Sequence, residues 1–259
     1  MDHPHTAISS QSSPAKSPEA RTLVVWHLVL GIVVSLAAFG AFMGIADWVE
    51  DGASGEVRFD RAILLWLHHH QMPGLTELAK ALAIMGSPPV IIGIGVVATI
   101  FGFVYRHVRG AAWTIPTAIV GSGIIIQGVK LFVHRARPDL FKPLLHESGY
   151  SFPSGHSMIA VVVYGLLGYF AMRFARSVVA KRAIASVTIL VILLIGISRP
   201  YVGVHYPTDV LAGWAVGIPW LITCMGLHEV LSRHFARAGE PVLNQPPPIS
   251  RALEKRSDI

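Results

Sequence analysis

The stretch LVVWHLVLGIVVSLAAFGAFMGIA, residues 23–46, decides the fold of this chain, because its side chains are apolar apart from His27 and Ser35. Its 24 residues would form a helix about 36 Å long, which is enough to cross a bilayer with some tilt. Trp26 and Trp48 lie near its two ends, where aromatic side chains gather at membrane surfaces. The stretch therefore predicts a transmembrane helix.

Five further apolar runs follow the first one, and we expect each of them to cross the membrane. Glycine and proline are frequent inside them, which membrane bundles tolerate better than soluble helices do. We therefore expect an all-α fold, a polytopic membrane helix bundle with six transmembrane helices and short interfacial helices. The five further runs are residues 89–105, 113–133, 157–174, 183–197 and 210–231.

The segment between the first two runs, residues 47–86, differs because it is rich in acidic side chains and holds only short apolar patches. Its second half has apolar side chains at helical spacing, which predicts a short amphipathic helix. That helix is too short to span a bilayer, so we expect it and residues 62–67 to lie at the membrane interface. The apolar positions are Leu75, Leu78, Ala79, Leu82 and Ala83.

The composition excludes several classes of protein. Apolar residues make up 53% of the 259 residues. Charged residues make up 14%, whereas soluble domains contain about a quarter charged residues. This composition argues against a cytosolic protein and against disorder of most of the chain. The single cysteine, Cys224, excludes a disulfide scaffold. The net charge of +6 is spread between apolar runs, so cationic loops explain it better than a nucleic-acid partner.

The charge distribution also predicts topology. Residues 1–21 and 233–259 are polar tails that we expect to be disordered, flanking a membrane domain over 22–232. Six spans place both tails on one side, which carries thirteen of the 21 Lys and Arg residues, against eight on the other side. The bias predicts cytoplasmic termini and a cell (inner) membrane protein.

Three polar clusters interrupt the apolar pattern, all on the predicted outer face. The first contains Lys130 and Arg137, followed by Pro138. Their spacing of seven would place both cations on one helix face, with Pro138 marking the helix end, and two such cations suit a phosphate. The alternative is a basic cluster that reaches toward lipid headgroups.

The second cluster is Pro153-Ser154-Gly155-His156, directly before the fourth run. Ser154 is a natural N-cap, and Gly155 allows a ligand to approach the backbone closely. Because the exposed N–H groups of a helix start attract anions, His156 would lie where it can deliver a proton to a bound anion. The alternative is a plain helix start with an incidental histidine.

The third cluster runs from Ser198 and Arg199 to His205 and Asp209. The last two are four residues apart around Pro207, which fits the first turn of a helix. A carboxylate within reach of an imidazole selects its tautomer and supports its positive charge, so His205 becomes a candidate nucleophile or base. The alternative is an interfacial ion pair without a catalytic role.

Together the clusters match the pattern K-x6-R-P, P-S-G-H and S-R-x5-H-x3-D, with every position filled. The chain thereby resembles the type 2 phosphatidic acid phosphatase superfamily over residues 23–231. The resemblance implies a covalent phosphohistidine route without metal or other cofactor. It implies that His205 is the nucleophile, Asp209 its orienting partner and His156 the acid. The implied phosphate-binding residues are Lys130, Arg137, Arg199, Ser154 and Gly155.

The predicted place of the site at the membrane surface favours a lipid phosphate as substrate, with membrane lipids around the chain; the oligomeric state is open. We expect an undecaprenyl diphosphate phosphatase, with phosphatidate or phosphatidylglycerophosphate as alternative substrates. Two other functions remain: a phosphotransferase that passes the phosphoryl group to another lipid, and a lipid-phosphate transporter or scaffold that needs neither histidine. The run His68-His69-His70 is not expected to bind a metal, because consecutive helical side chains diverge.

Overall fold

The computed structural model describes residues 18–50, 57–104 and 109–238, and every regular element in these ranges is a helix. Helices α6 and α7 join through the π-helical turn η2 into one continuous segment. The helices are α1 Pro18–Glu50, α2 Arg58–His69, α3 Pro73–Met85, α4 Pro88–Val104, α5 Arg109–Val133, α6 Gly155–Ile159, η2 Ala160–Tyr164, α7 Gly165–Phe174, α8 Val178–Tyr201 and α9 Pro207–Ala238.

Within the described residues, five helical segments are long and apolar enough to cross a membrane. Helices α3 and α4 meet at a bend of 48°, and the count becomes six if this pair forms a single broken span. The all-α membrane bundle is therefore confirmed. The structure joins α3 to α4 through a short break at Gly86 and Ser87, and the place of α3 at the membrane interface stays a prediction.

The first and last helices, α1 and α9, extend beyond their predicted ends. Helix α1 begins at Pro18, inside the predicted tail over 1–21, and α9 continues to Ala238, past the predicted boundary at 232. Apolar side chains next to these boundaries favour helix, and the helical hydrogen bonds continue beyond the apolar run. The rest of both predicted tails, residues 1–17 and 239–259, lies outside the described residues.

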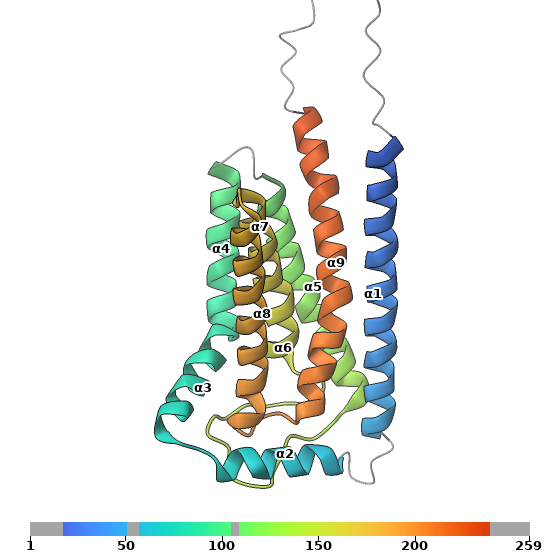
Figure 1. Ribbon diagram of the computed structural model, residues 1–259. Helices are drawn as coiled ribbons and strands as arrows, with labels where there is room; N and C mark the ends of the chain where they lie inside the picture. Colours follow the sequence, from blue (N-terminus) through green and yellow to red (C-terminus); the bar gives the residue numbers. More distant parts are fainter. Residues whose placement is uncertain (1–17, 51–56, 105–108, 239–259) are drawn as a thin grey trace, which may run out of the picture.

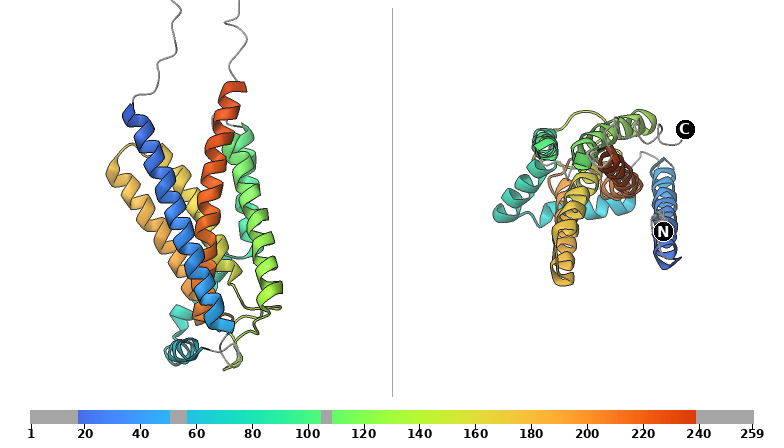
Figure 2. Two further views of the ribbon diagram at one scale, coloured as in Figure 1. Left: turned by 90° about the vertical axis from the view of Figure 1, so that its right-hand side faces the viewer. Right: turned by 90° about the horizontal axis from the view of Figure 1, so that it is seen from above.

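Helix α9 packs against α1, α5 and α6, and so links the N-terminal helix to the centre of the bundle (Figures 1 and 2). One apolar cluster joins Phe42 and Val49 of α1 to Ala212 of α9. A second cluster joins Ile115 of α5 to the continuous segment α6–η2–α7 and to Cys224 of α9, which is buried among apolar neighbours. Many large apolar side chains on the outer helix faces are exposed, as expected for helices that meet lipid.

Helix α2 lies across one end of the bundle, together with the long connection of residues 134–154 (Figure 1). The described chain starts and ends at the opposite end (Figure 1). The consecutive histidines of α2 diverge as expected: His69 Nδ1 contacts the Leu65 carbonyl at 2.8 Å, whereas the His68 ring stacks on Phe141 with centroids 4.1 Å apart. This end of the bundle contains all three polar clusters.

Candidate active site

The start of α9 orients an imidazole. Pro207 is the first helical residue, and the Asp209 carboxylate reaches back to accept a hydrogen bond from the backbone N–H of Tyr206 at 2.9 Å, as in a capping box. The same Asp209 oxygen lies 3.3 Å from His205 Nδ1. Because a carboxylate accepts the Nδ1 proton, the lone pair of His205 is directed to Nε2. Both side chains are almost fully buried.

The start of α6 is hydrogen-bonded directly to α9. Ser154 is the N-cap, as predicted, and its hydroxyl accepts hydrogen bonds from the Ser157 backbone N–H at 3.4 Å and the Ser157 hydroxyl at 2.9 Å. The backbone N–H of Ser154 donates to the Asp209 carbonyl at 2.9 Å. The predicted acid, His156, and the predicted nucleophile, His205, are therefore held on two helix starts that share a backbone hydrogen bond.

Arg199 enters the same space from the end of α8. Its guanidinium is buried, with 1% of the side chain exposed, and it donates to the Glu147 carboxylate. Its Nε–H has no hydrogen-bond partner among the described residues. A buried donor without an acceptor is costly, so this group is a place where a ligand oxygen would be stabilised.

Glu147 lies between the cations and the histidines. Its carboxylate oxygens are 3.1 Å from Arg137 Nη1, 3.6 Å from His205 Nε2 and 3.9 Å from His156 Nδ1. Burial alone would raise the pKa of Glu147, but the adjacent His205 ring and the Arg199 charge outweigh it and lower that pKa well below its ordinary value. The carboxylate is therefore ionised, and one anion already contacts the candidate nucleophile and acid.

The two cations of the first cluster do not share a helix face, so that expectation is wrong. Helix α5 ends at Val133, and His134 has a φ of 53°, which turns the chain out of the helix before Arg137. The two cations still lie at the same end of the bundle. Arg137 donates to the carbonyls of Ser148, Gly149 and Val204, and Lys130 Nζ donates to the Tyr150 carbonyl at 2.6 Å.

Asp209 also belongs to a buried ion-pair network, which the sequence analysis did not predict. Arg135 donates to Asp209 at 2.6 Å and to Asp60 of α2 at 2.7 Å, and its guanidinium lies 4.0 Å from the centroid of the Tyr206 ring. Asp60 is fully buried and also accepts from the Thr208 backbone N–H at 2.9 Å. This network ties the interfacial helix to the start of α9.

The sequence contains only weak signals for these missed residues. Arg135 lies inside the first cluster, but its spacing of five from Lys130 places it off the assumed helix face. Glu147 lies midway between the first and second clusters, in a stretch without helical periodicity, so no spacing links it to either cluster. Asp60 belongs to the acidic segment before α3, where a solvent-exposed carboxylate is the ordinary expectation.

An apolar groove of about 320 Å³ leads from the membrane-spanning part of the molecule to this cluster. Side chains of α4 and α5, such as Ile92, Ile119 and Ile126, line its apolar part. Lys130 and His156 line its polar end. The groove thus connects a region that suits hydrocarbon with a region that suits an anion.

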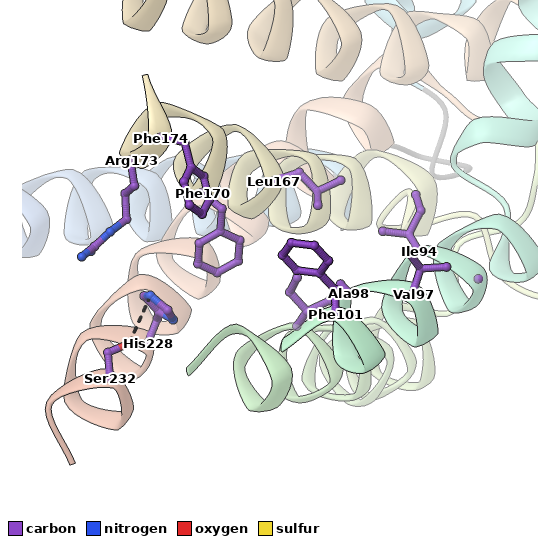
Figure 3. Close-up of a pocket in the computed structure, with 12 residues that line it drawn as sticks. Ile94, Val97, Ala98, Phe101, Leu167, Phe170, Arg173, Phe174, His228 and Ser232 are labelled. Atoms are coloured by element: carbon purple, nitrogen blue, oxygen red, sulfur yellow. Dashed lines mark hydrogen bonds between the residues drawn. The ribbon is translucent and has the colours of Figure 1, made fainter. Parts of the chain in front are cut away.

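A larger cavity of about 740 Å³ lies elsewhere, between α4, α5, α7 and α9 (Figure 3). Phe101, Phe170 and Leu167 make it apolar, while Arg173 and His228 lie at one side of it (Figure 3). It contains none of the residues of the three clusters, and its lining includes the distal parts of α7 and α9. We therefore place the candidate site at the smaller groove, where the ionisable groups are.

Comparisons with known proteins identify a family and several similar chains. The family described as the PAP2 superfamily matches residues 111–233. A phosphatidylglycerophosphatase B of Bacillus subtilis (strain 168) is 32% identical over 206 residues, which cover 77% of this chain and 96% of that protein. A lipid A 1-phosphatase of Rhizobium etli is 38% identical over 110 residues, covering 39% of this chain and 43% of that protein.

A solved structure is similar as well. The crystal structure of a transmembrane PAP2 type phosphatidylglycerolphosphate phosphatase from Bacillus subtilis superimposes with a TM-score of 0.69 at 29% sequence identity. The superposition covers 76% of this chain and 96% of that one. The helix arrangement described above is therefore shared with a membrane phosphatase.

Proposed function

The chain belongs to the PAP2 superfamily, and from this membership we propose that it is an integral membrane phosphatase that hydrolyses the terminal phosphate of a lipid. The observation that supports the proposal most is the apolar groove whose polar end is formed by Lys130 and His156. A lipid tail fits the apolar part, and a phosphate fits the cluster of Arg199, Arg137 and the two histidines. Soluble phosphate esters would leave the apolar part unused.

The first chemical step is transfer of the phosphoryl group to His205. Its Nε2 lone pair attacks phosphorus, so a P–N bond forms while the bond to the lipid oxygen breaks. His156 gives its proton to that departing oxygen. Arg199, Arg137 and Lys130 offset the charge on the phosphoryl oxygens, and Ser154 and Gly155 form the helix start beside them. Asp209 stabilises the positive charge that develops on His205.

The second step releases phosphate. A water oxygen attacks the phosphohistidine, the P–N bond breaks, and His156 accepts a proton from the water. The products are inorganic phosphate and the lipid alcohol, or the lipid monophosphate when the substrate is a diphosphate. Every step is assigned to side chains of this protein, and we expect turnover to continue in EDTA.

Two lipids are the first substrates to test. Phosphatidylglycerol phosphate is favoured by the Bacillus subtilis relative, whose alignment covers most of both chains. Undecaprenyl diphosphate is favoured by the expectation drawn from the sequence. Both carry a terminal phosphate at the membrane surface, which suits a cationic site at the end of an apolar groove.

The topology is part of the proposal. The cluster lies at the end of the bundle opposite the ends of the described chain (Figure 1). The six-span prediction assigns thirteen of the 21 Lys and Arg residues to the side of the termini, and by the positive-inside rule this bias favours termini in the cytoplasm. The active site would then face the outer side of the cell membrane. Single-cysteine labelling of an exposed loop residue such as Ser148 from outside intact cells tests this.

Phosphate release by purified protein tests the activity. The expected result is release from one or both lipids in EDTA, loss of at least 10³-fold in His205→Ala, and retention in the matched control His146→Ala. His146 is exposed in the same connection and contacts none of the catalytic groups described above. Full turnover by His205→Ala would overturn the assignment. Lipid movement across vesicles that persists in that variant would instead favour a transporter.

A trapping experiment tests the intermediate. With lipid carrying ³²P in its terminal phosphate, wild-type protein denatured in alkaline detergent during turnover should carry an acid-labile label, because a phosphohistidine survives base and not acid. The label should be absent from His205→Ala. Radiolabel that appears on a second lipid instead of in inorganic phosphate would identify a phosphotransferase.

A further inference from the structure

Glu147 fills the place that the proposed function assigns to the substrate phosphate. One of its oxygens accepts from Arg199 and lies 3.9 Å from His156 Nδ1. The other lies 3.1 Å from Arg137 Nη1 and 3.6 Å from His205 Nε2. A phosphoryl group within reach of the His205 lone pair would overlap this carboxylate. Neither chemical step described above uses a carboxylate at that point.

We propose that Glu147 is an internal competitor of the substrate, whose carboxylate fills the phosphate site of the resting enzyme and withdraws when a phosphoryl group enters. The inference rests on the proposed function, because it identifies the contents of the same site between turnovers. Its physical basis is the burial of Arg199, of which 1% of the side chain is exposed. A buried cation without an anion is strongly destabilising, so the empty site needs an occupant.

A phosphate is the better occupant of the site. The carboxylate has two oxygens and one charge, and it leaves the Nε–H of Arg199 without an acceptor among the described residues. A terminal phosphate carries three oxygens and up to two charges, so it can satisfy this donor as well as those that Glu147 engages. The unsatisfied Nε–H therefore favours exchange of the carboxylate for a phosphate.

The surrounding chain allows Glu147 to leave without rearranging the fold. The segment before it is anchored, because the Leu144 backbone N–H donates to the Val202 carbonyl at 2.9 Å and Phe141 stacks on His68. The segment after it passes through Gly149, whose φ of +76° is a left-handed conformation that suits glycine. The Glu147 side chain is itself 24% exposed, so it can rotate outward to solvent while these anchors stay in place.

Competition from the Glu147 carboxylate weakens the binding of every external anion by the same factor. The apparent affinity of a ligand falls by the fraction of molecules whose site is free. If the carboxylate occupies the site nine-tenths of the time or more, removing its charge should tighten phosphate binding about tenfold or more. Glu147→Gln keeps the shape and removes the charge, so it isolates this effect.

Inorganic phosphate is the probe, and its effect on the apparent melting temperature of the full chain in detergent is the readout. The phosphate concentration that gives half the maximal shift should fall about tenfold in Glu147→Gln relative to wild type. Asp139→Asn is the matched control, because Asp139 is exposed in the same connection and the variant loses the same charge. Its half-maximal concentration should stay within about twofold of wild type.

The outcomes separate the two proposals. Equal or weaker phosphate binding by Glu147→Gln would overturn the competitor role and leave the phosphate site intact. The lack of any phosphate response in all variants, Glu147→Gln included, would overturn the phosphate site and with it both proposals. If Glu147→Gln does not fold, Glu147→Asp serves instead: its shorter side chain keeps the charge but reaches the cations less well, and tighter phosphate binding is again the expected result.

Discussion

Gly213 permits the close contact that brings the two candidate catalytic histidines together. It lies on α9 against the start of α6, and a methyl group at this position would be 2.6 Å from the Ser154 carbonyl oxygen and 2.9 Å from Ser157 Cβ. The first of these atoms belongs to the backbone and cannot rotate away. Ordinary contact begins at 3.4 Å, so Gly213→Ala requires the two helix starts to separate by about 0.8 Å.

This separation acts directly on the reaction. His156 is two residues from Ser154 on α6, and His205 precedes α9, so the distance between acid and nucleophile grows with the gap. A misplacement of about 1 Å costs on the order of 10²-fold in rate, and we expect a loss of that size in kcat for Gly213→Ala. Overpacking should cost about 1–3 kcal/mol of stability, partly offset by about 1 kcal/mol from the helix propensity of alanine.

A graded series on the same helix provides the control. A methyl group at Gly217 would meet Val161 Cβ at 3.1 Å, whereas one at Gly226 would meet nothing within 4 Å. Phosphate release in detergent, with melting temperatures measured in parallel, should show the largest loss for Gly213→Ala, a smaller one for Gly217→Ala and none for Gly226→Ala. If Gly213→Ala turns over within twofold of Gly226→Ala while all three fold, the close contact does not set the catalytic geometry.

Three other perturbations have defined outcomes. Asp60→Asn removes the charge of one partner of the buried Arg135 and should destabilise the protein by about 3–5 kcal/mol, measurable as a lower melting temperature; an unchanged value would show that the other partners of Arg135, Asp209 and Thr208 among them, stabilise it without that charge. The depressed pKa of Glu147 means that its contribution to stability is present above its ordinary pKa of 4.5 and is lost as the pH falls below that value, so Glu147→Gln should flatten the acid side of the melting profile. Lys130→Ala should raise KM more than it lowers kcat, because Lys130 lines the groove but bonds to the Tyr150 carbonyl and not to His205; equal losses in kcat and kcat/KM would instead assign it to the transition state.

The helices of this protein could be predicted from sequence because hydropathy is a local property. Each apolar run must satisfy its backbone hydrogen bonds within itself in lipid, so length and composition are enough to identify it. The same holds for local site geometry. Ser154 caps α6 and Asp209 approaches His205 as their spacing predicts, since both contacts are made within one helical turn.

The tertiary structure alone decided which distant residues meet. Residues 134–154 lack helical periodicity, so no pattern could place Glu147 against Arg199, which is 52 residues away. Nor could a pattern pair Asp60 with Thr208 across 148 residues. The predicted apolar run over 113–133 ends where α5 ends, at Val133, but the expected extension of that helix to Pro138 was wrong, because Pro138 marks only the latest possible end of a helix. The sequence alone identifies the candidate reactive side chains, because their motifs are local. Packing of α2, α6, α8 and α9 at one end of the bundle determines which side chains they contact, since buried charged groups are stable only where opposite charges lie beside them.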